Sequence, residues 1–157
     1  MLEKTYGSDV YGVDATTITI EVSVVTGTNY FMVGLPDSAV KESWFRIESA
    51  FRYSGFEMPR KKIIINLAPA DIRKEGSAYD LPMAIGIMKA NEQFEDTIDV
   101  SKYIIMGELS LDGSIQPIKG ALPIAIQARK EGFKGFILPK ANAREAGIVN
   151  NLDVYGV

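Results

Sequence analysis

The chain of 157 residues contains no cysteine and no histidine. These absences exclude disulfides and the cysteine and histidine types of zinc site. A Ser-His-Asp triad, a Cys-His pair and an imidazole general base are excluded for the same reason. Any proton-transferring base must therefore be Lys, Asp, Glu or Tyr, and we predict no metal site in this chain.

The sequence also lacks a strong charge imbalance and a long hydrophobic run. Its formal net charge is −3 and its pI is about 5.1, so binding to nucleic acid would need a local basic patch. Charged residues and glycines interrupt every apolar run, and the first five residues lack the apolar core of a signal peptide. We therefore expect a cytoplasmic protein with no membrane partner.

What is present suits one globular domain. The chain is 46% hydrophobic and 24% charged, which supplies enough apolar residues for a core at this length. Its prolines and glycines are dispersed between apolar runs, and we see no linker, repeat or low-complexity segment. We predict a single domain over residues 1–157.

Apolar periodicity in the first half predicts two strands followed by a helix. Residues 17–24 alternate strictly between apolar and polar side chains, and residues 30–33 form a second apolar run after a turn-forming segment. We expect these strands to form an antiparallel hairpin, with a flanking strand near residues 6–13. A helix should begin at Asp37 and Ser38 and end at Gly55. Its core-facing stripe consists of Val40, Trp44, Ile47 and Phe51.

The second half predicts alternating strands and helices. We expect strands at residues 63–67, 103–109, around 115, 136–138 and 154–155. Helices are expected at residues 80–90, from Pro123 to a stop at Gly132, and at 141–146, the first of them central and buried. The fold class is therefore α+β, a mixed β-sheet with helices packed on one face.

Three separated blocks of sequence resemble the magnesium-chelatase-like AAA+ ATPases, a family that includes bacterial competence proteins. The blocks are NLAPADIRKEG at residues 66–76, VGLPDSAVKES at 33–43 and GELSLDG at 107–113. They keep the order and spacing of the family over nearly the whole chain. The resemblance implies a fold similar to the Lon protease domain, the GHMP kinases and a ribosomal small-subunit domain. It also implies an AAA+ module after this region, which uses ATP and Mg²⁺ and forms a homo-oligomeric ring. The phosphate loop GxxxxGK[ST] of such a module is absent from this sequence.

Similarity to Lon-type peptidases raises the question of a Ser/Lys dyad. Matching the serine motif without gaps places Ala78 at the nucleophile position, and matching the lysine motif places Leu122 at the lysine position. Neither side chain can attack a carbonyl or move a proton, so we predict no catalytic residue. A dyad displaced by slippage, Ser77 with Lys119, remains the alternative.

The signature at residues 66–76 has both structural and docking interpretations. We expect Asn66, Pro69 and Gly76 to shape a strand end and a tight connection, in which Asn66 or Asp71 bonds to loop backbone groups. Asp71, Arg73, Lys74 and Glu75 would form a docking surface, or be ordinary solvated charges. A separate hypothesis assigns DNA phosphate contacts to Arg60, Lys61, Lys62, Arg73 and Lys74.

Together these observations predict a non-catalytic accessory domain, without a cofactor of its own, within a magnesium-chelatase-related ATPase. It would serve ring assembly and DNA handling during branch migration and recombination in natural transformation. Its partners would be the AAA+ module, neighbouring subunits and DNA. The alternatives are the Ser77–Lys119 peptidase and an interaction module of a metal-chelatase complex.

Overall fold

A mixed seven-stranded sheet runs through the molecule. The computed structural model describes residues 1–93, 95 and 97–157. Across these residues β1–β2 and β2–β4 pair antiparallel, while the other neighbouring strands of this sheet pair parallel. The strands lie in the order β3 (Tyr30–Val33), β4 (Lys62–Ala68), β2 (Asp14–Val25), β1 (Leu2–Tyr11), β5 (Tyr103–Ile105), β8 (Gly135–Leu138) and β9 (Asp153–Gly156).

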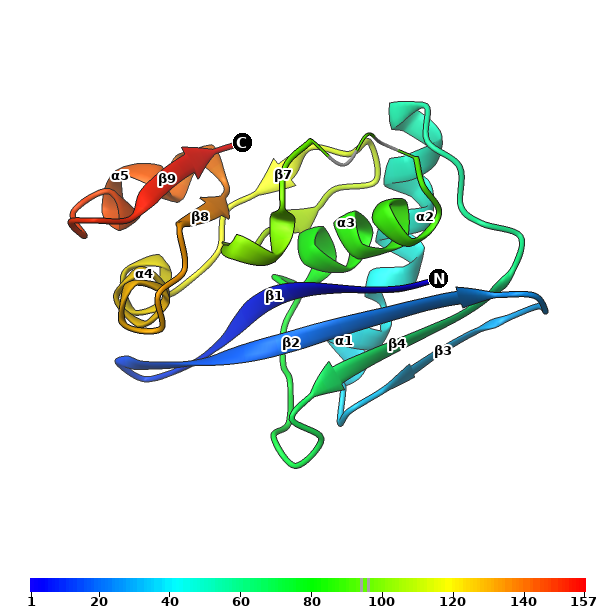
Figure 1. Cartoon of the computed structure of the whole chain (residues 1–157), viewed down its shortest axis with the longest axis horizontal. Coiled ribbons are helices and arrows are strands. Elements are labelled where there is room, and N and C mark those ends of the chain that lie inside the picture. Colours follow the sequence, from blue (N-terminus) through cyan, green and yellow to red (C-terminus); the bar gives the residue numbers. More distant parts are fainter. Residues whose placement is uncertain (94, 96) are drawn as a thin grey trace.

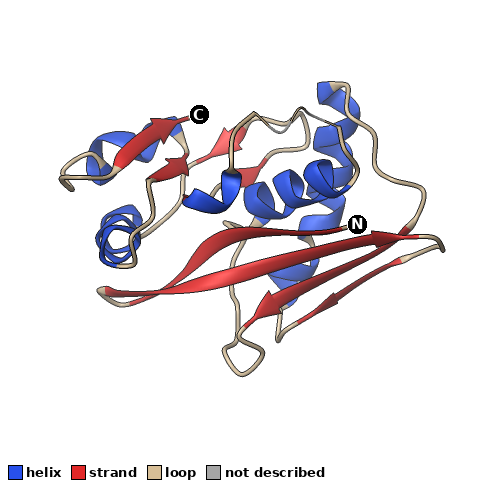
Figure 2. Cartoon of the chain, in the orientation of Figure 1, coloured by secondary structure: helices blue, strands red, loops and turns tan. Residues whose placement is uncertain are grey.

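The longer helices pack against this sheet and close the core. Figure 1 shows α3 (Asp80–Ala90) and α4 (Ala121–Lys130) on the same side of β1 and β2, and Figure 2 separates the helices from the sheet by colour. Helix α3 is buried along most of its length, as its uniformly apolar sequence predicts. The other elements are α1 (Ser38–Lys41), α2 (Ser43–Ser54), α5 (Ala143–Ala146), the 3₁₀ turns Val100–Lys102 and Lys140–Asn142, and a small sheet of β6 (Glu108–Leu109) and β7 (Ile115–Gln116).

The predicted α+β architecture is confirmed, but the predicted hairpin of residues 17–24 with 30–33 is wrong. Strand β4 lies between β2 and β3, and β3 pairs with β4 in parallel. The alternating apolar face of β2 meets that of β4 through Ile20–Leu67, Val22–Ile65 and Val24–Ile63. This long ladder, which local turn signals cannot reveal, replaces the short hairpin. The hairpin that does form joins β1 to β2.

The helix predicted from Asp37 to Gly55 is interrupted. Helices α1 and α2 meet at Glu42. Its carbonyl accepts a hydrogen bond from the N–H of Phe45, three residues later, as in a 3₁₀ turn. Both predicted ends are confirmed: the Asp37 side chain accepts from Val40 N at 2.8 Å, and Gly55 adopts φ +81°. The predicted apolar stripe is buried despite the interruption.

The strand predicted at residues 103–109 is also interrupted. Gly107 leaves the main sheet because its N–H donates to Ala78 O at 2.9 Å and its carbonyl accepts from Leu81 N at 3.0 Å. Glu108 and Leu109 then pair with β7, which confirms the predicted return strand. The hydrogen bonds of Gly107 therefore attach the block at residues 107–113 to the start of α3.

The last third follows the prediction more closely. Strands β8 and β9 pair in parallel with α4 packed against β8. Helix α4 carries Pro123 in its first turn and ends before Gly132, which has φ +83°. The predicted helix at 141–146 is shorter, since a 3₁₀ turn precedes α5.

Candidate functional site

The three sequence blocks meet in space around one loop. The connection from β4 to α3 returns to the block at residues 33–43. There, Lys74 N donates to Leu35 O at 3.0 Å and Asp37 N donates to Lys74 O at 2.9 Å. Asp37 also accepts from Gly76 N at 3.2 Å through the second oxygen of its capping carboxylate. Gly107, from the block at residues 107–113, is hydrogen-bonded to Ala78 and Leu81 on either side of Tyr79. The three blocks therefore form one structural unit.

This unit borders a cavity of about 900 Å³, here called the motif cleft. Ser77, Ala78 and Lys119 all line it, so the aligned nucleophile position and both residues of the displaced dyad share one space. Leu122 is not among the lining residues, and its backbone N–H donates to Glu145 at 3.2 Å. Within the described residues, no hydrogen bond joins Ser77 to Lys119. The methyl group of Ala78 offers no nucleophile at the aligned position.

Charged side chains give the motif cleft a mixed, mainly acidic lining. Arg73 forms an exposed ion pair of 3.7 Å with Glu75. At the floor, the hydroxyl of Tyr79 donates to Asp9 at 3.2 Å. Burial raises the pKa of Tyr79 strongly, and the neighbouring Asp9 charge adds to this effect. Burial likewise raises the pKa of Asp9, against the lowering effects of the Tyr79 hydrogen bond and of Lys74.

Lys74 does not belong to a docking or DNA-binding surface. Its side chain is completely buried, and its Nζ donates to Gly34 O at 2.7 Å and to Pro69 O. Desolvation lowers its pKa, while the charges of Asp71 and Asp9 act in the opposite direction. A residue with no exposed surface cannot reach a phosphate or a partner, so this part of the prediction is corrected.

Asn66 also differs from its predicted role. Its side chain donates to Glu21 at 2.8 Å, the residue opposite it on β2, and therefore links two strands. Gly76 does serve the tight connection, since it has φ +86°. A left-handed conformation of this kind favours glycine. Pro69 receives the Lys74 hydrogen bond described above.

Sequence reasoning missed an ion pair at the start of α3. Asp80 is fully buried and accepts from Arg46 at 2.6 and 3.0 Å and from Leu109 N at 3.0 Å. The hydrogen bond to Asp80 raises the pKa of Arg46, against the effect of burial. Arg46 further donates to Ala39 O and Ser43 Oγ, so the pair connects both early helices to α3 and β6. Asp80 and Arg46 lie 34 residues apart in sequence, and no local pattern relates them.

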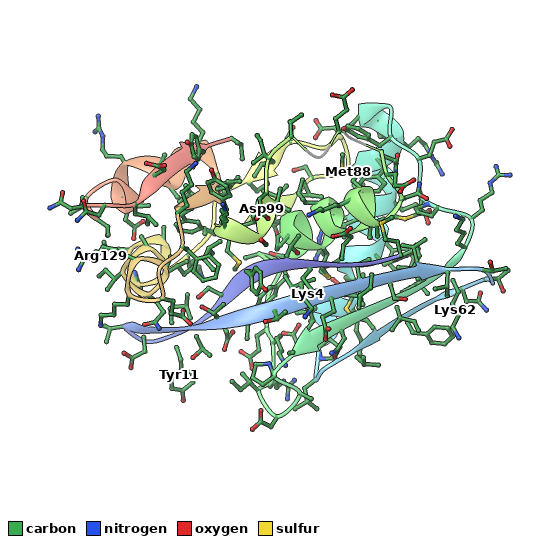
Figure 3. The ribbon with its side chains drawn as sticks, in the orientation of Figure 1. Lys4, Tyr11, Lys62, Met88, Asp99 and Arg129 are labelled. Atoms are coloured by element: carbon green, nitrogen blue, oxygen red, sulfur yellow. The ribbon has the colours of Figure 1, made fainter. Side chains whose placement is uncertain are left out.

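Arg60, Lys61 and Lys62 do not line the motif cleft. Arg60 and Lys61 line a second cavity of about 620 Å³, the basic cavity, together with Arg52, which sequence analysis did not select. Lys62 packs its ammonium 5.5 Å from the centre of the Phe31 ring. In Figure 3, Lys62 lies at the opposite end of the long strands from Tyr11, which lines the motif cleft. Arg73, also at that cleft, is therefore separated from the Arg60–Lys62 cluster.

Residues 1–93, 95 and 97–157 contain no group of three or more acidic side chains placed to hold a metal ion. No helix formed by these residues is long and apolar enough to cross a bilayer.

Comparison with known proteins places these features in a family. Residues 20–142 match the family described as subunit ChlI of magnesium chelatase. The chain is 46% identical over 140 residues to the uncharacterized protein YifB of Escherichia coli, covering 88% of this chain and 27% of that protein. It is 41% identical over 145 residues to the competence protein ComM of Haemophilus influenzae, covering 92% and 28%.

A more distant similarity supports the Lon-like fold. The archaeal Lon protease of Thermococcus kodakarensis is 31% identical over 94 residues, which are 60% of this chain and 14% of that protease. The chain spans less than a third of YifB and ComM. The extent of the family match, with the convergence of the three blocks that carry the resemblance, shows that the chain belongs to the ChlI-type, magnesium-chelatase-related family.

Proposed function

We propose that this chain is a non-catalytic accessory domain of a magnesium-chelatase-related AAA+ ATPase and serves assembly and DNA handling. The observation that carries the proposal is the convergence of all three family blocks on a cleft that presents Ala78 at the aligned nucleophile position. Backbone and side-chain hydrogen bonds hold the blocks together, which supports a fixed contact surface for partners. The ATPase module, with ATP and Mg²⁺, would lie in the complete, ring-forming cytoplasmic protein.

The DNA-handling part of the proposal rests on the basic cavity. Arg52, Arg60 and Lys61 gather there, and the similarity to a competence protein points to DNA as a partner. Branch migration and recombination during natural transformation are the proposed setting. Glu48 and Glu57 also line this cavity, so only weak phosphate binding without base preference is expected from one domain. Joining several such domains in a ring would strengthen this phosphate binding by avidity.

Fluorescence anisotropy with branched and duplex DNA at several salt concentrations tests this proposal. Two or three phosphate contacts give a log–log salt slope of about −2. Replacing Arg60 and Lys61 by Ala should remove most of that slope. The matched control replaces the exposed Arg129 and Lys130, with Arg129 at the other end of the molecule from Lys62 (Figure 3), and should bind like the unaltered chain. Tight binding insensitive to salt, or equal binding by both double variants, would refute the DNA role.

The non-catalytic assignment has its own test. Isothermal titration should detect no tight ATP binding to the 157-residue chain, whereas the complete protein should hydrolyse ATP. The chain lacks the backbone cradle and Lys that hold phosphates in P-loop enzymes. An ATP affinity in the micromolar range for the chain itself would contradict the assignment.

One observation keeps a peptidase as the second candidate, since Ser77 and Lys119 share the motif cleft. A dyad would require the Lys119 amine to take the proton of the Ser77 hydroxyl as that oxygen attacks a carbonyl. A fluorogenic peptide assay compares the unaltered chain with Ser77→Ala and Lys119→Met. We expect no cleavage by any of the three. Cleavage that is lost in both variants would establish the dyad and reject the accessory assignment.

A further inference from the structure

An apolar groove of about 240 Å³ lies beside the end of the last strand. Its walls come from α3, the 3₁₀ turn at Val100, β5, β7 and β8, with Val157 at its rim. A depression with only aliphatic walls offers water no hydrogen-bonding partner, so an apolar side chain is its favoured occupant. The walls are Leu81, Ile85, Val100, Ile105, Ile115 and Ile137.

The path of the chain leads toward this groove. Val157 N donates to Leu138 O at 2.9 Å, and Lys140 N donates to Val157 O at 2.9 Å. Strand β8 then gives way to Pro139 and a 3₁₀ turn. A residue after Val157 thus finds no further ladder partner on β8, because proline has no N–H and the turn leaves the strand direction. Figure 1 shows β9 running toward β7 and α3.

We infer that the groove is the docking site of the segment that follows Val157 in the complete protein, which seats one or two aliphatic or aromatic side chains there. The inference rests on the proposed function, in which the chain continues into an ATPase module. YifB and ComM are more than three times as long as the part matched here. The docked segment would fix the direction in which the module leaves this domain.

A tethered segment suits this groove better than a second copy of the chain. A stable protein–protein interface buries about 1,600 Å² in total, whereas a groove of about 240 Å³ has room for only one or two side chains. A covalently attached segment is held at high effective concentration, so a small apolar contact is enough to keep it in place. The aliphatic walls also give no charge pattern that would orient another protein.

Hydrogen exchange measured by mass spectrometry tests the inference. Amides of residues 100–105 and 137–138 should exchange at least tenfold more slowly in the complete protein than in the 157-residue chain. Ile85→Ser in the complete protein should remove most of this difference and make the segment after Val157 more sensitive to protease. The control is Ile126→Ser on α4, a more exposed isoleucine that lies outside the groove, and it should leave the difference intact.

The possible outcomes separate this inference from the proposed function. Equal exchange in both lengths of chain, in a complete protein that hydrolyses ATP, would overturn the docking alone. Protection of the groove in a protein without ATPase activity would remove the proposed function and retain the docking. Protection that grows with the concentration of the 157-residue chain would identify a second copy as the occupant and overturn the inference. A gene that ends at residue 157 would overturn both.

Discussion

The Nζ atom of Lys74 donates a 2.7 Å hydrogen bond to the backbone oxygen of Gly34, forty residues earlier in the chain. The two residues belong to different blocks of the family resemblance, and the bond closes one block over the other. A buried ammonium needs such acceptors because desolvation penalises its charge. Lys74 is thus a structural residue of the signature, in contrast to its exposed neighbour Arg73.

Replacing Lys74 by Met should lower the free energy of unfolding by about 1–3 kcal/mol, because the carbonyls of Gly34 and Pro69 lose a buried donor. Urea denaturation measures the change. Arg73→Met is the matched control: its side chain is 71% exposed, and its effect should stay within about 0.5 kcal/mol. Equal losses in the two variants would show that burial of Lys74 does not matter.

The Arg46–Asp80 pair should be more sensitive to truncation than any surface pair. Arg46→Met leaves the buried Asp80 carboxylate without its cation and should lower the free energy of unfolding by about 3–5 kcal/mol. Glu42→Gln removes an exposed carboxylate from the neighbourhood of Arg46, 3.8 Å away and 66% exposed, and should cost about 1 kcal/mol or less. If the Asp80→Asn/Arg46→Met double variant is as unstable as the sum of the single variants, the two side chains are not coupled.

Asp9 should make stability depend on pH in an unusual direction for a carboxylate. Its pKa is raised above 3.8 in the folded chain, so its protonated form favours folding. That contribution is present below pH 3.8 and is lost as pH rises through the folded pKa. Asp9→Asn imitates the protonated form and retains an oxygen that can accept from Tyr79.

The Asp9→Asn variant should therefore be more stable than the unaltered chain at pH 7, and this advantage should vanish near pH 3. Urea unfolding at the two pH values provides the comparison. Asp153→Asn, at an exposed position of β9, serves as the control for removing a carboxylate. An advantage of Asp9→Asn that is the same at both pH values would argue against a raised pKa.

Substitutions at Gly34 and Gly76 distinguish the cost of a steric clash from the cost of a left-handed backbone conformation. A Cβ atom on Gly34, which has φ +101°, would lie 2.1 Å from Leu67 O, whereas one on Gly76, with φ +86°, meets no atom within 4 Å. Gly76→Ala should cost about 1–2 kcal/mol from its left-handed backbone alone. Gly34→Ala should cost clearly more, or prevent folding, because a backbone atom must move. Thermal unfolding of both variants checks the order, and a smaller loss at Gly34 would contradict it.

The amino-acid sequence by itself determined the features that depend on near neighbours. The alternation at residues 17–24 specified a half-buried strand, Asp37 and Gly55 specified two helix ends, and the apolar run after Asp80 specified a central helix. The lack of cysteine and histidine excluded whole classes of chemistry without any structure. Each of these inferences needs only the residue itself and neighbours within a few positions.

Only the tertiary structure decided which of these elements touch. The insertion of β4 between β2 and β3 reversed a prediction based on turn chemistry, and it follows from a ladder between strands far apart in sequence. Lys74 looks like a surface charge within its motif, and only the return of its loop to Gly34 buries it. The pairing of Arg46 with Asp80 likewise depends on two helices meeting. These contacts have no local signature, because the stability of a long-range pair depends on the burial and alignment that the whole sheet provides.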